Sequence, residues 1–134
     1  MTGRGAPQPF DWMTLLEYAE ERVACRSQFM RRLVINRAYY AAFHVARGGL
    51  RDLGVVDADA RFHRRLWRHF ERAAGAAPGQ ARAWRMIGEI GNGLHAERTR
   101  ADYESAATWS ADDCARIVAD ARSLVDRVGA LTAR

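Results

Sequence analysis

The stretch Ser110–Leu131, SADDCARIVADARSLVDRVGAL, decides the fold class of this chain of 134 residues. Its apolar residues recur at a period close to 3.6 residues, which is typical of a helix that buries one side. Ser110 followed by Asp113 predicts a capped start of that helix. The apolar stripe comprises Cys114, Ile117, Val118, Ala121, Leu124, Val125, Val128 and Leu131.

A first helix is expected after a Pro-containing lead-in at residues 1–10, which we expect to be flexible. Either Asp11 or Thr14 can cap this helix. Thr14 and Glu17 also have the three-residue spacing of a capping box. The helical spacing of apolar residues fades near Arg26, where we expect the helix to end.

Two further helices follow in the sequence. Ser27 can cap the longest helix of the chain, which runs towards Leu53, and Gly54 is a natural stop beyond it. The next predicted helix covers residues 61–74 and keeps an apolar stripe at four-residue spacing.

A fourth helix is predicted from about Gln80 to Tyr103. Three glycines interrupt it, so we expect either a kink near Asn92 or a close approach to another helix. No strand-like alternation is visible in the sequence. We therefore predict an all-α fold, an up-and-down bundle of four to five helices in a single domain over residues 11–134.

The composition is that of an ordinary globular chain, with 49% hydrophobic and 28% charged residues. No apolar run approaches the roughly 18 residues that span a bilayer, so we expect no membrane association. The first 13 residues lack the apolar stretch of a signal peptide. Two cysteines, Cys25 and Cys114, do not make a disulfide framework. Together these features favour a cytoplasmic protein.

All 21 basic residues are arginines, and 16 acidic residues leave a net charge of +5. This surplus is compatible with an anionic partner, although a GC-rich genome also raises the arginine content. The placement of the charge is more informative than its sum. Five arginines surround the apolar stripe of the third helix: Arg61, Arg64, Arg65, Arg68 and Arg72. This basic patch could meet nucleic-acid phosphates, or it could be a solvated helix face.

A dense polar cluster lies in the second helix at residues 36–44, NRAYYAAFH. Arg37 and His44 are seven residues apart and so project from nearly the same side of a helix, with Tyr40 between them. A cation, a phenol and an imidazole on one stripe could bind a phosphate and move a proton, as cleavage of an RNA backbone requires. Alternatively, these side chains hydrogen-bond neighbouring helices and fix the bundle.

A second cluster lies in the fourth helix at residues 95–103, HAERTRADY. His95, Arg98 and Asp102 share one helix face, and Arg98 can pair with Asp102 four residues later. A structural ion pair near a helix end and a binding site are both compatible with this pattern. His63 and His69 lie on different faces of the third helix with no cysteine nearby, so we expect no metal site and no cofactor.

With both clusters present in this order, the chain resembles a HEPN domain. It is most similar to the small stand-alone branch with a RAYYAAFH helix, here residues 37–44, and a later RxxADY segment, here residues 98–103. The resemblance spans roughly residues 12–131. It implies a HEPN-like bundle that is usually dimeric and occurs in toxin–antitoxin, abortive-infection and CRISPR-linked defence systems.

Many members of that family are metal-independent ribonucleases that use an arginine and a later histidine with four to six residues between them. Arg37 and His44 satisfy this spacing on the second helix. Arg98 has the late position of the family's arginine, but Tyr103 stands where the histidine would follow. The candidate catalytic residues are therefore Arg37, His44 and Arg98, and the candidate binding residues are Asn36, Tyr40, His95, Asp102 and Tyr103.

Two functions remain open at this point. In the first, a homodimer binds RNA or a nucleotide and cleaves RNA without metal. His44 would move the proton, and Arg37 or Arg98 would stabilise the charge on phosphorus. In the second, a non-catalytic dimer serves as the partner or antitoxin-like module of a minimal nucleotidyltransferase, because stand-alone HEPN proteins are often encoded beside one.

Overall fold

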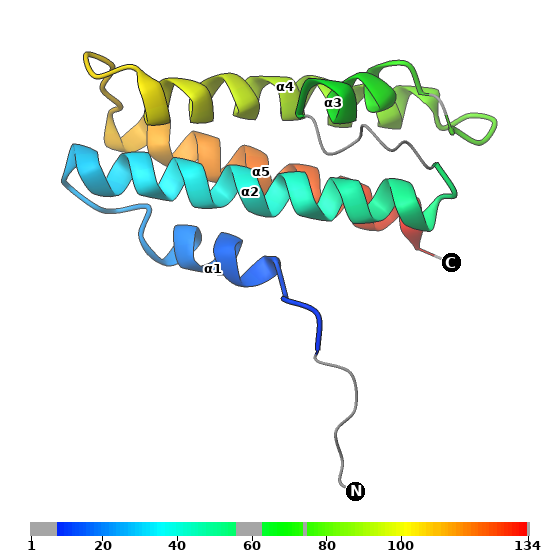
Figure 1. Cartoon of the computed structure of the whole chain (residues 1–134), viewed down its shortest axis with the longest axis horizontal. Helices are drawn as coiled ribbons and strands as arrows, with labels where there is room; N and C mark the ends of the chain where they lie inside the picture. Colours follow the sequence, from blue (N-terminus) through cyan, green and yellow to red (C-terminus); the bar gives the residue numbers. More distant parts are fainter. Residues whose placement is uncertain (1–7, 56–62, 74, 134) are drawn as a thin grey trace, which may run out of the picture.

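The computed structural model describes residues 8–55, 63–73 and 75–133. All regular structure in these residues is helical, which confirms the predicted all-α class. This part of the chain forms five helices, and Figure 1 shows how they are arranged. They are α1 (Met13–Glu21), α2 (Gln28–Asp52), α3 (His63–Glu71), α4 (Ala81–Tyr103) and α5 (Ala111–Thr132).

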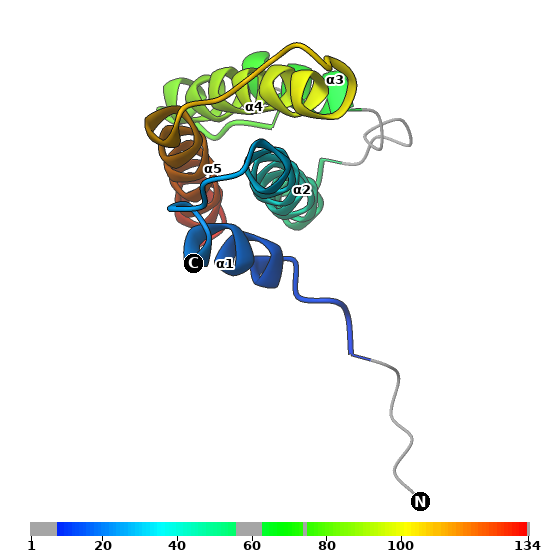
Figure 2. The ribbon, with the colours of Figure 1, turned by 90° about the vertical axis from the view of Figure 1, so that its left-hand side faces the viewer.

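Helix α2 is the central element of the bundle. It packs against α1, α4 and α5, while α3 lies alongside α4 and only touches α2. The end-on view in Figure 2 places α1, α4 and α5 on three sides of α2. The remaining side of α2 faces away from α5 and is not covered by any of the five helices. Half-buried side chains of the 36–44 segment lie in this helix.

The predicted starts of the two longest amphipathic helices are confirmed. The Ser27 side chain accepts a hydrogen bond from the Met30 amide at the start of α2. Ser110 and Asp113 form a reciprocal capping box at the start of α5. At the other end of α2, Gly54 has a φ of +80°, a conformation that glycine adopts without strain.

Helix α1 uses one of its two candidate caps and ends earlier than predicted. Of the two candidate caps, Asp11 accepts from the Met13 amide, and the Thr14–Glu17 capping box does not form. The helix ends at Glu21 rather than near Arg26. The Arg22 guanidinium folds back over the ring of Tyr18, and the Arg22 amide bonds to a carbonyl three residues earlier, which closes the last turn.

Helix α3 is observed over a shorter range than the predicted 61–74. The described helix, His63–Glu71, buries Leu66, Trp67 and Phe70. Residues 61, 62 and 74 of the prediction, including Arg61 of the basic patch, lie outside the described residues.

The glycines of α4 serve a close approach between helices. The helix runs through this region as one element, and the structure displays the predicted close contact. A Cβ atom at Gly91 would overlap the indole of Trp67 in α3. At Gly88 it would lie 2.8 Å from the backbone nitrogen of Glu71. Small residues at these positions therefore set the α3–α4 distance.

The core contains apolar side chains from all five helices, and Tyr39, Trp67 and Trp84 are among its largest members. Cys25 and Cys114 are both free thiols. None of the helices in the described part of the chain combines the length and apolarity needed to cross a bilayer.

Candidate nucleic-acid interface

The two polar motifs predicted from the sequence meet between α2 and α4. Arg37 donates to Asn36 Oδ1 at 2.7 Å, and Asn36 Nδ2 donates to Asp102 at 3.2 Å. Asp102 in turn pairs with Arg98 at 3.3 Å. We call these four residues the α2–α4 cluster. A continuous polar chain thus joins positions that are more than 60 residues apart in the sequence.

Arg98 is the innermost charge of this cluster. It is only 8% exposed and is the one buried charged residue in the described core. Its guanidinium carbon lies 5.3 Å from the ring centre of Tyr39 and 5.5 Å from that of Tyr40, which is within cation–π range. Its NH1 group reaches Asp102, but its Nε–H has no hydrogen-bond partner among the described residues. Arg98 therefore organises the cluster from inside.

The end of α4 is held in place by an arginine that the sequence did not single out. The Arg32 guanidinium donates to four carbonyl oxygens, those of Ala101 (2.8 Å), Glu104 (2.8 Å), Ser105 (3.2 Å) and Ala107 (2.6 Å). Carbonyls at a helix C-terminus lack helical partners, so a cation is favourable there. This clamp places Asp102 opposite Asn36. Tyr103, the next residue, is 77% exposed.

His44 lies one turn beyond Tyr40 along α2. Its ring stacks on the indole of Trp12, with 3.5 Å between ring centres and 10° between planes. The ring of Tyr40 also stacks on the His44 imidazole, with 6.3 Å between ring centres. Burial, followed by the charge of Arg47, lowers the pKa of His44 below its usual value. The imidazole is thus neutral at pH 7 and can accept a proton.

Tyr39 and His63 were not among the predicted site residues. The indole Nε1 of Trp67 donates to the Tyr39 hydroxyl at 3.1 Å, and that hydroxyl lies 2.6 Å from His63 Nδ1. Burial is the main cause that lowers the pKa of His63 to about 4, with the charge of Arg98 next. His63 is therefore neutral at pH 7, and its Nδ1 shares a hydrogen bond with the Tyr39 hydroxyl whose direction depends on the imidazole tautomer. Only the fold brings the start of α3 to the middle of α2, so sequence spacing gave no signal for this contact.

His95 extends this row of rings from α4. Its imidazole lies parallel to that of His63, with 5.3 Å between ring centres and 9° between planes. Burial and the charges of Arg98 and Arg64 lower its pKa. His95 therefore connects the α2–α4 cluster to the basic helix α3.

An open groove of about 480 Å³ lies between α3 and α4, on the side where His95 emerges. We call it the α3–α4 groove. Two of the predicted basic-patch residues, Arg64 and Arg68, line it, whereas Arg65 is not among the lining residues. Its other polar lining residues are Glu71, Asn92, His95, Thr99 and Arg100. Two predicted clusters, one basic and one on the fourth helix, are thus parts of a single surface.

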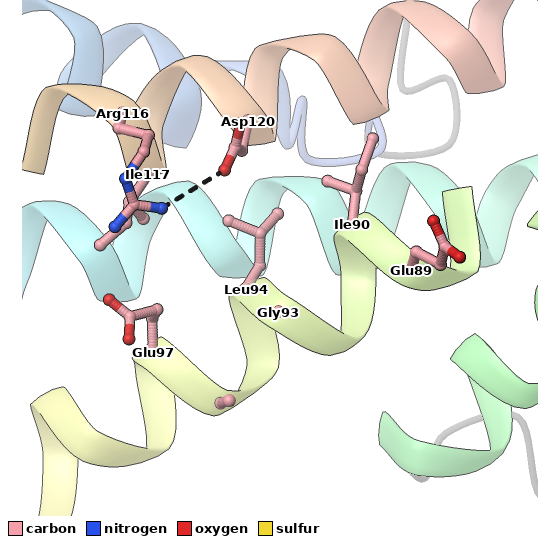
Figure 3. Close-up of a pocket in the computed structure, with 9 residues that line it drawn as sticks. Glu89, Ile90, Gly93, Leu94, Glu97, Arg116, Ile117 and Asp120 are labelled. Carbon is pink, nitrogen blue, oxygen red and sulfur yellow. Dashed lines mark ion pairs between the residues drawn. The ribbon is translucent and has the colours of Figure 1, made fainter. Parts of the chain in front are cut away.

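A second groove, of about 410 Å³, lies between α4 and α5 (Figure 3). Its floor is apolar, and its rim carries the carboxylates of Glu89, Glu97 and Asp120. Arg116 pairs with Asp120 at 3.8 Å across one edge. With three carboxylates and one arginine, this groove repels phosphate. Helix α4 thus presents a basic groove on one side and an acidic groove on the other.

The described residues contain no group of three histidine, cysteine or acidic side chains arranged to hold a metal ion. The two histidines near Tyr39, His63 and His95, lie close to a cation, because after burial the charge of Arg98 is the next cause that lowers the pKa of both. A divalent cation would be repelled at that position. The chemistry of this site is suited to anions.

The sequence model of the HEPN domain matches residues 15–131 of this chain. This range covers all five helices described above except the first residues of α1 and the last of α5. The chain therefore belongs to the HEPN domain family. Searches of the curated proteins and of the solved structures returned no match.

Proposed function

We propose that this HEPN protein acts on RNA in a toxin–antitoxin or defence-type system, and that it binds RNA on the side of α2 that none of the five described helices covers. The carrying observation is the α2–α4 cluster. Arg37, Tyr40 and His44 follow one another along α2, and Arg98 and Asp102 support them from α4. Such a set supplies a guanidinium for phosphate, a phenol ring for a base and an imidazole for a proton.

In the catalytic form of this proposal, RNA cleavage needs no metal. His44 takes the proton from a ribose 2′-hydroxyl, whose oxygen then attacks the adjacent phosphorus. The bond to the 5′-oxygen breaks, and a 2′,3′-cyclic phosphate remains on one product. The leaving 5′-oxygen takes a proton from water. Arg37 stabilises the charge that develops on the phosphoryl oxygens, and Arg98 holds Asp102 and the tyrosines in position.

We further propose that two copies pair across this same side. Large aromatic side chains are exposed around it, with Phe29 at 75% and Tyr103 at 77% exposure, next to the start of α2 and the end of α4. Phe29 and Asn36 are seven residues apart and so share a face of α2. A homodimer across this face would cover the aromatics and bring two sets of Arg37 and His44 to one cleft.

A second candidate function is a non-catalytic partner of a minimal nucleotidyltransferase. The observation in its favour is that the side chains of the α2–α4 cluster already pair with one another. Asp102 is engaged by both Arg98 and Asn36, and Arg37 donates to Asn36. In this version the α2–α4 cluster orders the bundle, and the protein binds RNA, a nucleotide or its partner without cleaving anything.

The test uses purified protein and unmodified RNA in EDTA, with wild type compared with Arg37→Ala and His44→Ala. The control is Arg127→Ala, which removes an exposed arginine of α5. We expect cleavage with a cyclic phosphate end in wild type and control, and at least a 100-fold loss in both site variants. RNA binding without cleavage would favour the second candidate. Cleavage that EDTA abolishes, or that both site variants retain, would contradict the catalytic proposal, and no RNA binding at all would contradict both.

Expression in a bacterial host gives an independent readout of the proposed system. We expect growth arrest that His44→Ala relieves, and relief by co-expression of a minimal nucleotidyltransferase where one is encoded beside this gene. Arrest that both site variants cause as strongly as wild type would contradict a role for this cluster.

A further inference from the structure

The α3–α4 groove combines cations that have too few counter-charges. Arg64 and Arg68 are exposed on α3, and no acidic partner for either lies among the described residues. Arg100 is paired with Glu97 at 2.9 Å and with Glu104 at 3.3 Å, so its charge is partly offset. Glu71 is the one carboxylate among the lining residues.

Neutral and cationic groups surround His95 on every helix that packs near it. Tyr39 of α2 lies 5.6 Å from its ring, and His63 of α3 stacks on it. Arg64 of α3 and Arg98 of its own helix disfavour its protonated form. In the groove beyond, Arg68 and Arg100 add positive charge, against the single carboxylate of Glu71. His95 is therefore neutral in the free protein, because burial disfavours its charged form and Glu71 is the one carboxylate among the described residues that line the groove with it.

The interior of the same region also contains an unused donor. Arg98 is more than nine-tenths buried, and its Nε–H has no partner in the described structure. A buried donor without an acceptor is unfavourable. Its charge acts on both His63 and His95. An anion near the rings of His63 and His95 would interact favourably with both imidazoles and with the Arg98 guanidinium.

We infer that the α3–α4 groove binds a phosphate group of the RNA backbone through Arg64, Arg68 and Arg100, and that His95 takes up one proton from solvent as the phosphate binds. This inference rests on the proposed function for the identity of the ligand. It places a second RNA contact on α3, separate from the cleavage cluster of α2. It also makes RNA affinity dependent on pH.

The phosphate assignment follows from the chemistry of the donors. Guanidinium groups match phosphate oxygens with two parallel hydrogen bonds, and the hydroxyl of Thr99 and the amide of Asn92 add neutral donors in the same groove. The groove is open along the helices rather than enclosed, which suits a continuous chain. A bound phosphate next to His95 would raise the pKa of its imidazole, because an opposite charge favours the protonated form.

The test measures binding of a 2′-O-methyl oligoribonucleotide, whose blocked 2′-oxygen prevents cleavage, by fluorescence anisotropy at pH 6.0 to 8.5 and constant ionic strength. For Arg64→Gln/Arg68→Gln we expect about tenfold weaker binding. The matched control, Arg82→Gln/Arg85→Gln, removes two exposed arginines near the start of α4, away from the groove, and should change binding less than twofold. Circular dichroism checks that each variant is folded.

The pH profile tests the role of His95. Wild-type affinity should rise about threefold from pH 8.5 to 6.0, since the bound form holds a proton that the free form lacks. His95→Asn should bind with a flat profile over this range. Added inorganic phosphate should raise the pKa of His95, which an NMR pH titration measures directly.

Each outcome is decisive. Equal losses in the groove variant and the control, or a pH profile that His95→Asn leaves unchanged, would overturn the inference while RNA binding by the α2 face still stood. Binding of a poly-glutamate peptide as tight as that of RNA would overturn the assignment to phosphate. If wild type bound no RNA, the proposed function itself would fail. If phosphate alone shifted the pKa of His95 while groove variants bound RNA normally, the groove would be a site for free phosphate and not for RNA.

Discussion

One helix, α4, supplies two arginine-containing sites that differ in how their charges are compensated. In the α2–α4 cluster, Arg98 is buried and pairs with Asp102. In the α3–α4 groove, Arg64 and Arg68 are exposed and face a single carboxylate, Glu71. The same side-chain chemistry therefore organises the bundle in one place and remains available to a ligand in the other. Burial and the local count of counter-charges decide which role an arginine takes.

Separating α3 from α4 should have the largest effect on the difference between the two arginine sites. Gly91→Leu places a side chain where the indole of Trp67 now lies, and overpacking of a filled core costs about 3 kcal/mol or more. We expect a large loss in the free energy of unfolding, measured by urea denaturation, and loss of the groove. The α2–α4 cluster does not include α3 and should be affected less in RNA cleavage than in RNA binding at the groove.

Gly93→Ala is the matched control for that substitution. Gly93 lies in the same helix with open space around its Cα, and alanine is favoured over glycine in a helix interior by about 1 kcal/mol. We expect this variant to be slightly more stable than wild type. A similar loss in both variants would mean that helix propensity, and not the contact with α3, determines the effect.

The next largest effect should come from the paired cluster. Asp102→Ala leaves the buried guanidinium of Arg98 without its counter-charge, and we expect about 2 kcal/mol of lost stability. The double variant Arg98→Met/Asp102→Ala removes both charges and should lose less than the sum of the single changes. Asp126→Ala is the control, because Asp126 is exposed and its pair with Arg122 is worth little. Additive losses in the double variant would contradict a coupled pair.

The sequence predicted those features of the fold that depend on local periodicity. The α5 stripe and the caps at Ser27 and Ser110 follow from helical spacing and from side chains that satisfy free amides. It failed at α1, because the turn that ends the helix depends on Arg22 folding over Tyr18, a contact that apolar spacing does not encode.

The candidate site was predictable only within each helix. Spacing correctly indicated that Arg98 and Asp102 could pair, since they are one turn apart. In the sequence, Tyr39 belongs to the polar motif at residues 36–44 and His63 belongs to the basic third helix, and no local pattern relates the two residues. Their hydrogen bond depends on the path from α2 to α3 and on the close α3–α4 contact at Gly91. Contacts between helices of this kind have no signature in one sequence.

His63 lies between the two sites, and its titration should make the stability of the protein depend on pH. Its pKa is about 4 in the folded protein and near 6.5 when unfolded. Between these values the unfolded chain binds a proton that the folded chain does not, so stability is lost as pH falls from 6.5 towards 4. Because the ring is partly solvated, we expect this contribution to be about 1 kcal/mol.

The measurement compares wild type with His63→Gln, whose amide can still accept from Tyr39. Urea denaturation at pH 7.0 and 4.5 should show a larger loss for wild type than for the variant. Equal losses would assign the acid sensitivity to other groups and would remove His63 from the link between the sites.

The smallest expected effect concerns Glu71, the carboxylate that limits the positive charge of the α3–α4 groove. Glu71→Gln keeps an oxygen for its contact with the Asn92 amide and removes one negative charge. We expect RNA to bind about twofold more tightly at low salt, and the gain to shrink as salt screens the charge. Glu89→Gln changes the net charge by the same amount in the α4–α5 groove, so it separates a local effect from a global one. If both variants tightened binding equally, total charge would draw RNA to the protein and the contrast between the two sides of α4 would have no part in it.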